Sequence, residues 1–563
     1  MANLKRLRFK RQSSGIACLA LALASVTAAP VARTDAPDVY AIKDARIVTG
    51  AGRTIAKGTV VIRDGLITDV GENAKIPADA RVIEGAGLTV YPGLIDGYTH
   101  AALSAPEPAG AARQGAPPGS QMSLTPQAQE QRREQALGDP SDSAADQVRP
   151  GGATLENLQA VGVTAALTSP RQGIFAGRSA LVNLAGESAA KMVVRAPVAL
   201  TVQFTTVGGF GGGYPSSLMG TVSYIRQTFY DAIRYRDEAA RYEKVKRGVP
   251  RPEHDRRLAA LLPALRGELP VLFVANSDGD IRRALRIADE FKLRPIIAGA
   301  LEGYRVADLL KAKNAPVILS VDFPKRAADL PEDVEESLRE LRERADAPKG
   351  AARLAQAGVK FAFTAGSLKP QDFIANVRKA VENGLPKEEA LRALTVNAAE
   401  IFGVSDQLGT IETGKIANLT VTSGDLFAKD AKVRYLFIDG EQVDIKKPEA
   451  PRPGGERAAA PGATVNPAGT WNLIVKLPQG DMNVTLNLQR EGEQFTGTMT
   501  APMGTTAIDN VTLTGNQLRF ITTLHLGDPV QATVAATIEG DTMEGTITVP
   551  DRGSFEFTGT RPR

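Results

Sequence analysis

The chain has little cysteine, little histidine and few aromatic residues. Among 563 residues there are one cysteine and three histidines, and aromatic side chains make up 5%. The cysteine, Cys18, lies so near the N-terminus that the chain beyond it can form no disulfide and has no thiol nucleophile. Apolar side chains nevertheless make up 43% and charged ones 23%, which is typical of a soluble globular protein with a large core and two or three domains.

The first 28 residues have the pattern of a bacterial secretion signal. Five basic residues precede an apolar stretch, 15–26, that is too short to span a bilayer, and Val26-Thr27-Ala28 supplies the small residues of a cleavage site. This predicts a mature chain that begins near Ala29, is periplasmic or secreted, and has no membrane segment after cleavage. The alternative is an uncleaved anchoring helix. Cys18 precedes most of the apolar stretch, whereas a lipidation cysteine would follow it, so a lipoprotein is not expected.

The basic excess of the chain belongs to this signal. The formal charge of +4 becomes about −1 once the five basic residues are removed, because no acidic residue precedes position 29. We therefore expect no nucleic-acid partner.

The stretch from Val90 to His100 carries the most specific motif. It reads Val-Tyr-Pro-Gly-Leu-Ile-Asp-Gly-Tyr-Thr-His, an apolar run and a Pro-Gly turn that lead to Asp96 at the end of a buried strand. It resembles the amidohydrolase superfamily, whose first barrel strand carries Pro-Gly, two apolar residues and Asp-x-His-x-His. The resemblance implies that residues 98 and 100, two apart on one strand, face the same way and bind a divalent metal that activates water. His100 fills the second position, but Tyr98 fills the first, and a phenol is a poor zinc ligand.

Two distant segments predict the halves of a small β-sandwich domain, at 38–90 and 404–445. Alternating strands flank Asp64-Gly65 in the first half and Asp439-Gly440 in the second, and both dipeptides are strong hairpin signals. A split β-domain around a barrel is the amidohydrolase arrangement, and residues 408–415 resemble the stretch after its last barrel helix.

Residues 91–403 predict a (β/α)8 barrel. Apolar strand-like runs alternate with helical patterns, which is typical of a parallel sheet with crossover helices. The opening strand and seven further runs give the eight strands that a closed barrel needs: Val163–Thr168, Ala180–Leu184, Val198–Phe204, Val271–Ala275, Pro295–Ala298, Val317–Val321 and Val359–Thr364.

Two inserts interrupt this barrel pattern. Residues 101–152 are rich in Pro, Ala, Gly and Gln and predict a mobile loop, and residues 215–262 predict helix. The aromatic residues of the second insert are more typical of helix packing than of a ligand site: Tyr224, Phe229, Tyr230 and Tyr235.

The composition and the expected secondary structure of the chain change after the barrel. Residues 446–469 hold five prolines among Ala and Gly and predict a linker. Residues 470–563 contain eight short strand patterns with Gly-rich turns, which predict an all-β barrel or sandwich module. Its opening, Gly469-Thr470-Trp471, faintly resembles lipocalin-like barrels. The expected fold class is therefore α/β, a TIM-type barrel with a split β-sandwich domain and a C-terminal all-β module.

The resemblance implies a metal site, with zinc as the expected ion. In the family its ligands are the two strand-one His, a Lys or Glu of strand four, His of strands five and six, and Asp of strand eight. Here strand four, 198–204, has no Lys, Glu or Asp, strand five ends at Asn276, and strand six has no His. Ala365 or Gly366 stands where the Asp of strand eight belongs.

The histidine count leads to the same conclusion. His254 is expected at a solvated helix start, and His525 belongs to the C-terminal module. One imidazole cannot hold zinc at useful affinity, since catalytic sites generally offer three protein ligands. His100 is therefore expected to be a hydrogen-bonded remnant, although a vestigial metal ligand is the alternative.

Other sequence features suggest chemistry more weakly. Asp322, at the end of strand seven, is the one carboxylate in a catalytic location, and Glu302 lies just past strand six, where it could serve with Asp322 as a replacement ligand. Asp278 and Asp280 are expected to cap the following helix. The glycine-rich stretch 208–213 lacks the lysine and hydroxyl of a phosphate loop.

Two functions from different classes remain. The family resemblance, which covers 38–445 and is imidazolonepropionase-like or dipeptidase-like, implies a metal-dependent hydrolase of C–N bonds in cyclic amides or small dipeptide-like substrates. The residues themselves favour a non-catalytic relative that works as a binding subunit, as a homo-oligomer, or in a complex with a catalytically competent relative in the same compartment.

Overall fold

The computed structural model describes residues 39–103, 133–207, 214–326, 336–445 and, apart from six hairpin turns, 466–561. The predicted signal peptide (1–28), the glycine-rich stretch (208–213) and nearly all of the predicted linker (446–469) lie outside these residues. None of the helices in the described part of the chain combines the length and the apolar character that crossing a membrane requires.

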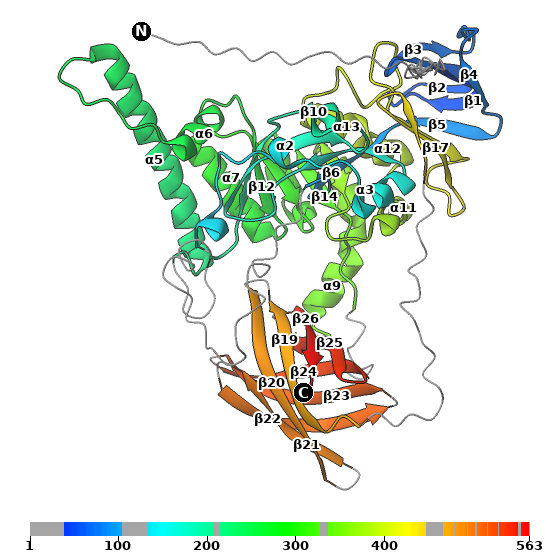
Figure 1. Ribbon diagram of the computed structural model, residues 1–563. Helices are drawn as coiled ribbons and strands as arrows, with labels where there is room; N and C mark the ends of the chain where they lie inside the picture. The colour runs from blue at the N-terminus through cyan, green and yellow to red at the C-terminus, as the bar shows by residue number, and fades with distance from the viewer. Residues whose placement is uncertain are drawn as a thin grey trace, which may run out of the picture.

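The two β-rich segments form one hydrogen-bonded sheet (blue and yellow in Figure 1). Its order is β18-β17-β16-β5-β1-β2-β3. The short strand β4 lies outside this order and pairs in parallel with β1. Tyr91 pairs with Thr420, which joins the two halves of the chain. Both predicted hairpins exist, and Asp64 and Asp439 adopt positive φ as such turns require. The strands are β1 (Val39–Val48), β2 (Thr54–Arg63), β3 (Leu66–Gly71), β4 (Arg81–Glu84), β5 (Leu88–Pro92), β16 (Leu419–Ser423), β17 (Val433–Ile438) and β18 (Glu441–Val443).

The TIM-type barrel is confirmed, and its wall contains seven strands that run in one direction. One block pairs β6 with β7, and the other pairs β11 through β15 in sequence. The ring closes where the Thr364 hydroxyl of β15 donates to the Tyr98 carbonyl of β6, at 2.5 Å. The strands are β6 (Leu94–Thr99), β7 (Val163–Thr168), β11 (Leu200–Gln203), β12 (Val271–Ala275), β13 (Pro295–Gly299), β14 (Val317–Ser320) and β15 (Phe361–Thr364).

The third strand position differs from the prediction. Residues Ala180–Asn183 form a strand, β9, but it runs antiparallel to β7, and β8 (Phe175–Arg178) runs antiparallel to β11. A parallel strand needs a crossover of a dozen or more residues. The segment between β7 and β9 has no helix among its described residues, so the chain fills the gap with antiparallel strands, and β10 (Val193–Arg195) pairs antiparallel with β9.

Helices cover the outside of the barrel, as Figure 1 shows. The predicted helical insert forms α5 and α6, in which Phe229 is fully buried and the Tyr230 hydroxyl bonds Glu290 at 2.7 Å. The insert 101–152, predicted to be a loop, contains the short helix α2 in its described part. The longer helices are α3 (Ala153–Ala160), α5 (Leu218–Val245), α6 (Arg256–Leu265), α7 (Asp278–Phe291), α9 (Leu338–Asp346), α11 (Phe373–Glu382) and α12 (Lys387–Leu394). The shorter ones are α2 (Ala144–Gln147), α4 (Ala189–Met192), α8 (Ala307–Ala312), α10 (Gly350–Gln356) and α13 (Val396–Ile401).

The N-cap residue of α7 differs from the prediction. Asp278 and Asp280 were the expected caps, but both lie inside the helix. The N-cap is Ser277, whose hydroxyl accepts the Asp280 backbone N–H at 3.1 Å. The serine comes first in the chain and already has the extended backbone of a cap residue, so the two acids occupy the first turn and interact with the helix dipole.

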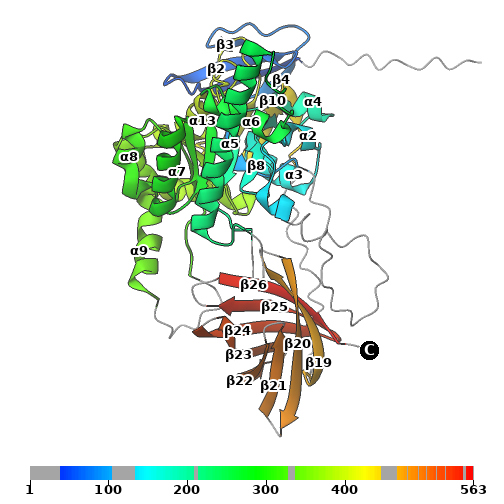
Figure 2. The same cartoon turned by 90° about the vertical axis from the view of Figure 1, so that its left-hand side faces the viewer.

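The C-terminal module is a closed eight-stranded antiparallel barrel (orange to red in Figures 1 and 2), which confirms the all-β prediction. Its core is a separate apolar cluster around Trp471, which is completely buried. The strands are β19 (Gly469–Leu477), β20 (Gly480–Glu491), β21 (Gln494–Ala501), β22 (Gly504–Thr514), β23 (Gln517–Leu526), β24 (Asp528–Glu539), β25 (Thr542–Val549) and β26 (Gly553–Thr560).

Candidate functional site

The carboxyl ends of the parallel strands form the rim where barrels of this kind carry their chemistry. The side chains that matter there are those at the ends of β6, β7, β11, β12, β14 and β15. An apolar layer beneath the rim fills the barrel interior, with Leu272, Ile296 and Ile318 among its members.

Asp96 of β6 is held inside the strand end. Its side chain is 1% exposed, and Oδ1 accepts the Tyr98 backbone N–H at 3.2 Å. Oδ2 has no hydrogen-bond partner in the described part of the chain. Burial raises the pKa of Asp96 to about 6, against the opposing effect of nearby donors on Thr364, Tyr98 and Ala365. The carboxyl group therefore ties the strand end together through the Tyr98 backbone N–H.

Tyr98 occupies the first of the two metal-ligand positions. Its ring packs against the apolar layer of the barrel interior and meets the His100 ring edge to face, with 5.4 Å between centroids. Burial raises the pKa of the Tyr98 hydroxyl above its usual value, so the phenol stays protonated at neutral pH. A neutral phenol is outside the ligand set that zinc uses, which is thiolate, imidazole and carboxylate. Tyr98 therefore serves at this position as a packing residue of the barrel interior.

His100 stands in the second ligand position and is hydrogen-bonded. Its Nδ1 lies 2.7 Å from the Ser169 carbonyl oxygen. A carbonyl only accepts, so Nδ1 carries the proton and Nε2 is left as the acceptor of a neutral ring. Burial lowers the pKa of His100, which the Ser169 contact opposes and the charge of Arg171 reinforces. One neutral imidazole, whose Nε2 has no hydrogen-bond partner among the described residues, is what the family pattern retains here.

The neighbouring strand ends carry neutral polar groups. The hydroxyl oxygens of Ser169 and Thr201, which follow β7 and lie in β11, are 2.7 Å apart and buried. The Ser320 hydroxyl of β14 accepts a hydrogen bond from the Asp322 backbone N–H at 3.1 Å. The Thr364 hydroxyl of β15 donates to the Tyr98 backbone carbonyl. Sequence reasoning missed this group of hydroxyls, because a Ser or Thr at a strand end has no spacing signal of its own.

The two carboxylates proposed as replacement ligands are bound to the protein instead. Glu302 is 9% exposed, its Oε2 accepts the Asp278 backbone N–H at 2.9 Å, and its Oε1 lies 3.0 Å from Arg305. Asp322 lies at the rim beyond β14, as predicted, and accepts the Ser367 hydroxyl at 2.5 Å. Both serve local structure, and within the described part of the chain neither contacts His100.

The other two histidines lie away from the rim. His254 is exposed just before α6, and its Nδ1 is 3.5 Å from the Tyr235 hydroxyl. His525 belongs to β23 of the C-terminal barrel. Among the residues that the structure describes, no three His, Cys, Asp or Glu side chains lie close enough together to hold a metal ion. The residues present at the rim do not fit the zinc that the family implies.

A pocket of about 370 Å³ opens beside the ends of β6 and β7. Its wall includes Arg171, whose charge acts on His100, and three carboxylates, Glu134, Asp139 and Asp142. The wall is therefore polar and mixed in charge. It offers hydrogen-bonding groups to a ligand, but its described residues do not form a metal site.

Comparison with known proteins agrees with this architecture. The model of the Amidohydrolase family matches residues 274–443. The solved structure of an amidohydrolase from Thermotoga maritima superposes with a TM-score of 0.59 at 26% identity, and the match covers 72% of this chain and 99% of that one.

Two shorter matches are to adenine deaminases. The protein of Moorella thermoacetica is 39% identical over 70 residues, and that of Clostridium botulinum strain Loch Maree is 34% identical over 67 residues. Each match spans 12% of this chain and 11% of the relative's length, so it covers only a small part of either protein. The family model, the Thermotoga maritima structure, the barrel, the split β-sheet and the motif that ends at His100 all point to the amidohydrolase superfamily.

Proposed function

We propose that this protein is a metal-poor, non-catalytic member of its superfamily that works by binding. The observation that carries the proposal is the Tyr98 ring, which packs into the barrel at a position where the family places a metal ligand. The strand ends around it supply hydroxyl and amide groups where hydrolytic chemistry needs imidazole and carboxylate. The polar pocket beside β6 and β7 is the place where we expect a ligand to bind.

The proposal extends to location and partner. With export directed by residues 1–28, the protein works in the periplasm or outside the cell, as a homo-oligomer or beside a competent amidohydrolase in the same compartment. The support is that the fold is kept while the metal-ligand positions hold other residues, and fold alone does not specify chemistry.

The rival function is a metal-dependent hydrolase of C–N bonds other than linear peptide bonds. The names of the deaminase relatives suggest adenine as a substrate for the test, and the family resemblance adds small dipeptides and cyclic amides such as hydantoins. The mature chain, assayed with added Zn²⁺, Mn²⁺ or Fe²⁺, is expected to hydrolyse none of them above the rate of the buffer. Enzyme-like turnover that tracks the protein through purification would establish the rival.

The partner is tested by affinity capture of the mature chain from periplasmic extract, with mass spectrometry and an amidase assay on the eluate. We expect an exported amidohydrolase relative or further copies of this chain. A monomeric chain that captures nothing, and that turns over dipeptides itself, would end the partner proposal.

A further inference from the structure

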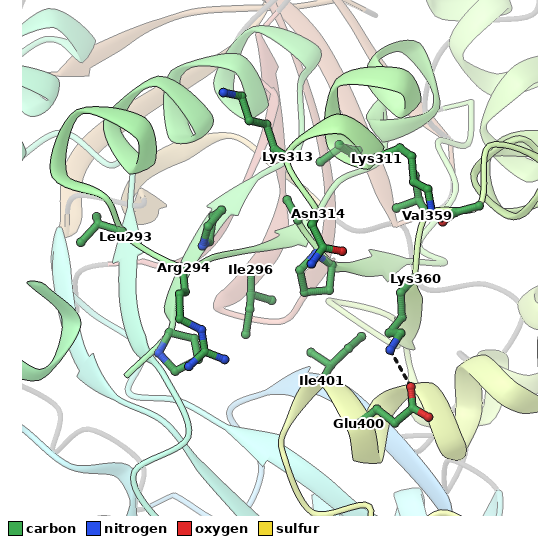
Figure 3. Close-up of a pocket in the computed structure, with 16 residues that line it drawn as sticks. Leu293, Arg294, Ile296, Lys311, Lys313, Asn314, Val359, Lys360, Glu400 and Ile401 are labelled. Atoms are coloured by element: carbon green, nitrogen blue, oxygen red, sulfur yellow. Dashed lines mark hydrogen bonds and ion pairs between the residues drawn. The ribbon is translucent and has the colours of Figure 1, made fainter. Parts of the chain in front are cut away.

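A second pocket lies at the opposite end of the barrel from His100. It has a volume of about 510 Å³ and is lined by the segments that lead into β13, β14 and β15 and by the end of α13 (Figure 3). This is the face where barrel enzymes of this fold do not place their chemistry, so the pocket is independent of the rim site and of the function proposed for it.

The interior of this pocket is apolar. Leu293, Ile296, Leu310 and Val359 each expose less than a tenth of their surface, and Ile401 is half-buried beside them. Figure 3 places Ile296 and Ile401 toward the middle, with the charged side chains around them. Such a floor favours the apolar body of a ligand.

The edge of the pocket is basic. Four cationic side chains line it, Arg294, Lys311, Lys313 and Lys360, against a single carboxylate, Glu400. Two of the four are neutralised, because Lys360 pairs with Glu400 at 2.6 Å and Lys313 with Asp289 at 2.8 Å.

The other two cations carry uncompensated charge. Arg294 donates to the Gly267 carbonyl at 3.1 Å and Lys311 to the Gly358 carbonyl at 2.8 Å, and no carboxylate pairs with either one among the described residues. Lys311 thereby satisfies a carbonyl just beyond the end of α10, as cations at helix ends commonly do. A carbonyl dipole does not cancel a full positive charge, so two positive groups remain at the edge of an apolar floor.

We propose that this pocket binds a small organic phosphate monoester with an apolar body. The volume is within the range of small-molecule sites. A phosphate monoester carries close to two negative charges at neutral pH, which matches the two uncompensated cations. The Arg294 guanidinium offers the paired donors that phosphate oxygens accept, Lys311 adds a point charge, and the Asn314 amide at the edge can donate as well.

The test is titration of the full mature chain with 1-naphthyl phosphate, and separately with 1-naphthol and with inorganic phosphate. We expect the phosphate ester to bind at least about tenfold more tightly than either fragment, since only the ester uses both floor and edge. Its affinity should fall as salt increases, because the cations are exposed.

Variants assign the binding to this pocket. The double variant Arg294→Gln with Lys311→Gln should weaken the ester about tenfold or more, whereas Glu400→Gln should strengthen it several-fold by releasing the charge of Lys360. The matched control, Arg234→Gln with Lys244→Gln on α5, removes the same charge elsewhere and should change affinity less than about twofold. Arg294→Gln alone replaces the double variant if that variant does not fold.

Three results would overturn the proposal. The first is an ester that binds no better than 1-naphthol. The second is an unchanged affinity in the folded pocket variant. The third is an equal loss in the control, which would show attraction to overall charge. None of these results bears on the rim site, so this proposal and the proposed function fail separately.

Discussion

At the scale of the residue, Tyr98 decides what the rim can do. Its ring supplies packing to the barrel interior, and its protonated hydroxyl stands where an imidazole would bind metal. The neighbouring groups, Ser169, Thr201 and Thr364, are engaged with one another or with backbone. Restoring one ligand therefore leaves the others missing.

The first prediction is that Tyr98→His restores neither metal nor activity. Two histidines at 98 and 100 still lack the carboxylate and further imidazoles of a hydrolytic site, because three protein ligands are the usual minimum. Metal content and turnover of adenine, dipeptides and hydantoins should match the wild type. Clear turnover by this single variant would show that the site has been misplaced.

Truncation of the same residue tests its packing role. Tyr98→Ala should lower the stability of the (β/α) barrel by roughly 3 kcal/mol, because it leaves a cavity in the interior, whereas Tyr98→Phe keeps the ring and should cost less than about 1 kcal/mol. Urea unfolding followed by circular dichroism at 222 nm measures both. Equal stability of the alanine and phenylalanine variants would contradict the packing role.

Asp96 gives a prediction about pH. Its folded pKa, about 6, is above the ordinary 3.8, so the folded chain holds this proton more tightly than the unfolded chain does. Between roughly pH 4 and 6 the group therefore loses stability as pH rises, and above that range it costs about 3 kcal/mol relative to the protonated form. Asp96→Asn cannot ionise, so its stability relative to the wild type should improve by up to that amount between pH 4.5 and pH 8. A difference that does not change with pH would show that Asp96 is not buried as a neutral acid.

At the scale of the element, the pairing of β19 with β26 closes the C-terminal barrel, and an aromatic–cation contact joins its first strand to the residue after its last strand. The Arg561 guanidinium lies 4.5 Å from the centre of the Trp471 ring, and Trp471 Nε1 donates to the Pro467 carbonyl at 2.9 Å. Arg561 also donates to the Asn466 carbonyl, so one side chain connects both ends of the module.

Arg561→Ala should therefore destabilise this barrel by about 1–2 kcal/mol. Trp471 is the only tryptophan of the chain, so its fluorescence during urea unfolding reports this barrel alone. Arg519→Ala, at an exposed position of β23, is the control and should change stability by less than about 0.5 kcal/mol. If the two variants unfold at the same urea concentration, the contact contributes nothing.

Most elements were predictable because their signals are local. Asp64-Gly65 and Asp439-Gly440 specify hairpins by themselves, and the alternation of apolar runs with helical patterns specifies the barrel. The direction of β9 was not predictable from its own residues, since it depends on the length of chain between its neighbours. Tyr98 packs against residues that are far apart from it in sequence, and the pocket beside Arg294 and Lys311 is likewise built from distant segments. No local sequence pattern predicts either feature.

At the scale of the whole molecule, the chain combines a superfamily barrel with a second barrel that has its own core. The apolar cluster around Trp471 contains residues of the C-terminal strands only, and the described helices all precede residue 402. A unit with a separate core can fold alone.

We accordingly expect the fragment 466–563 to fold by itself. Its Trp471 fluorescence should give the same unfolding midpoint as the full chain, while the signal at 222 nm of the full chain follows a different transition, because it reports the helices. A fragment that is disordered, or a tryptophan signal that moves only with the helices, would contradict an autonomous module.

The central claim is that the barrel rim holds no hydrolytic metal, and metal analysis of the purified mature chain tests it most directly. The protein is loaded with Zn²⁺, Mn²⁺ or Fe²⁺ and dialysed against a mild chelator. Its metal content is then measured by inductively coupled plasma mass spectrometry. With Tyr98 in the ligand position and His100 as the one imidazole at the rim, we predict well under one equivalent of each metal. One equivalent retained in wild type and lost in His100→Ala would contradict the account.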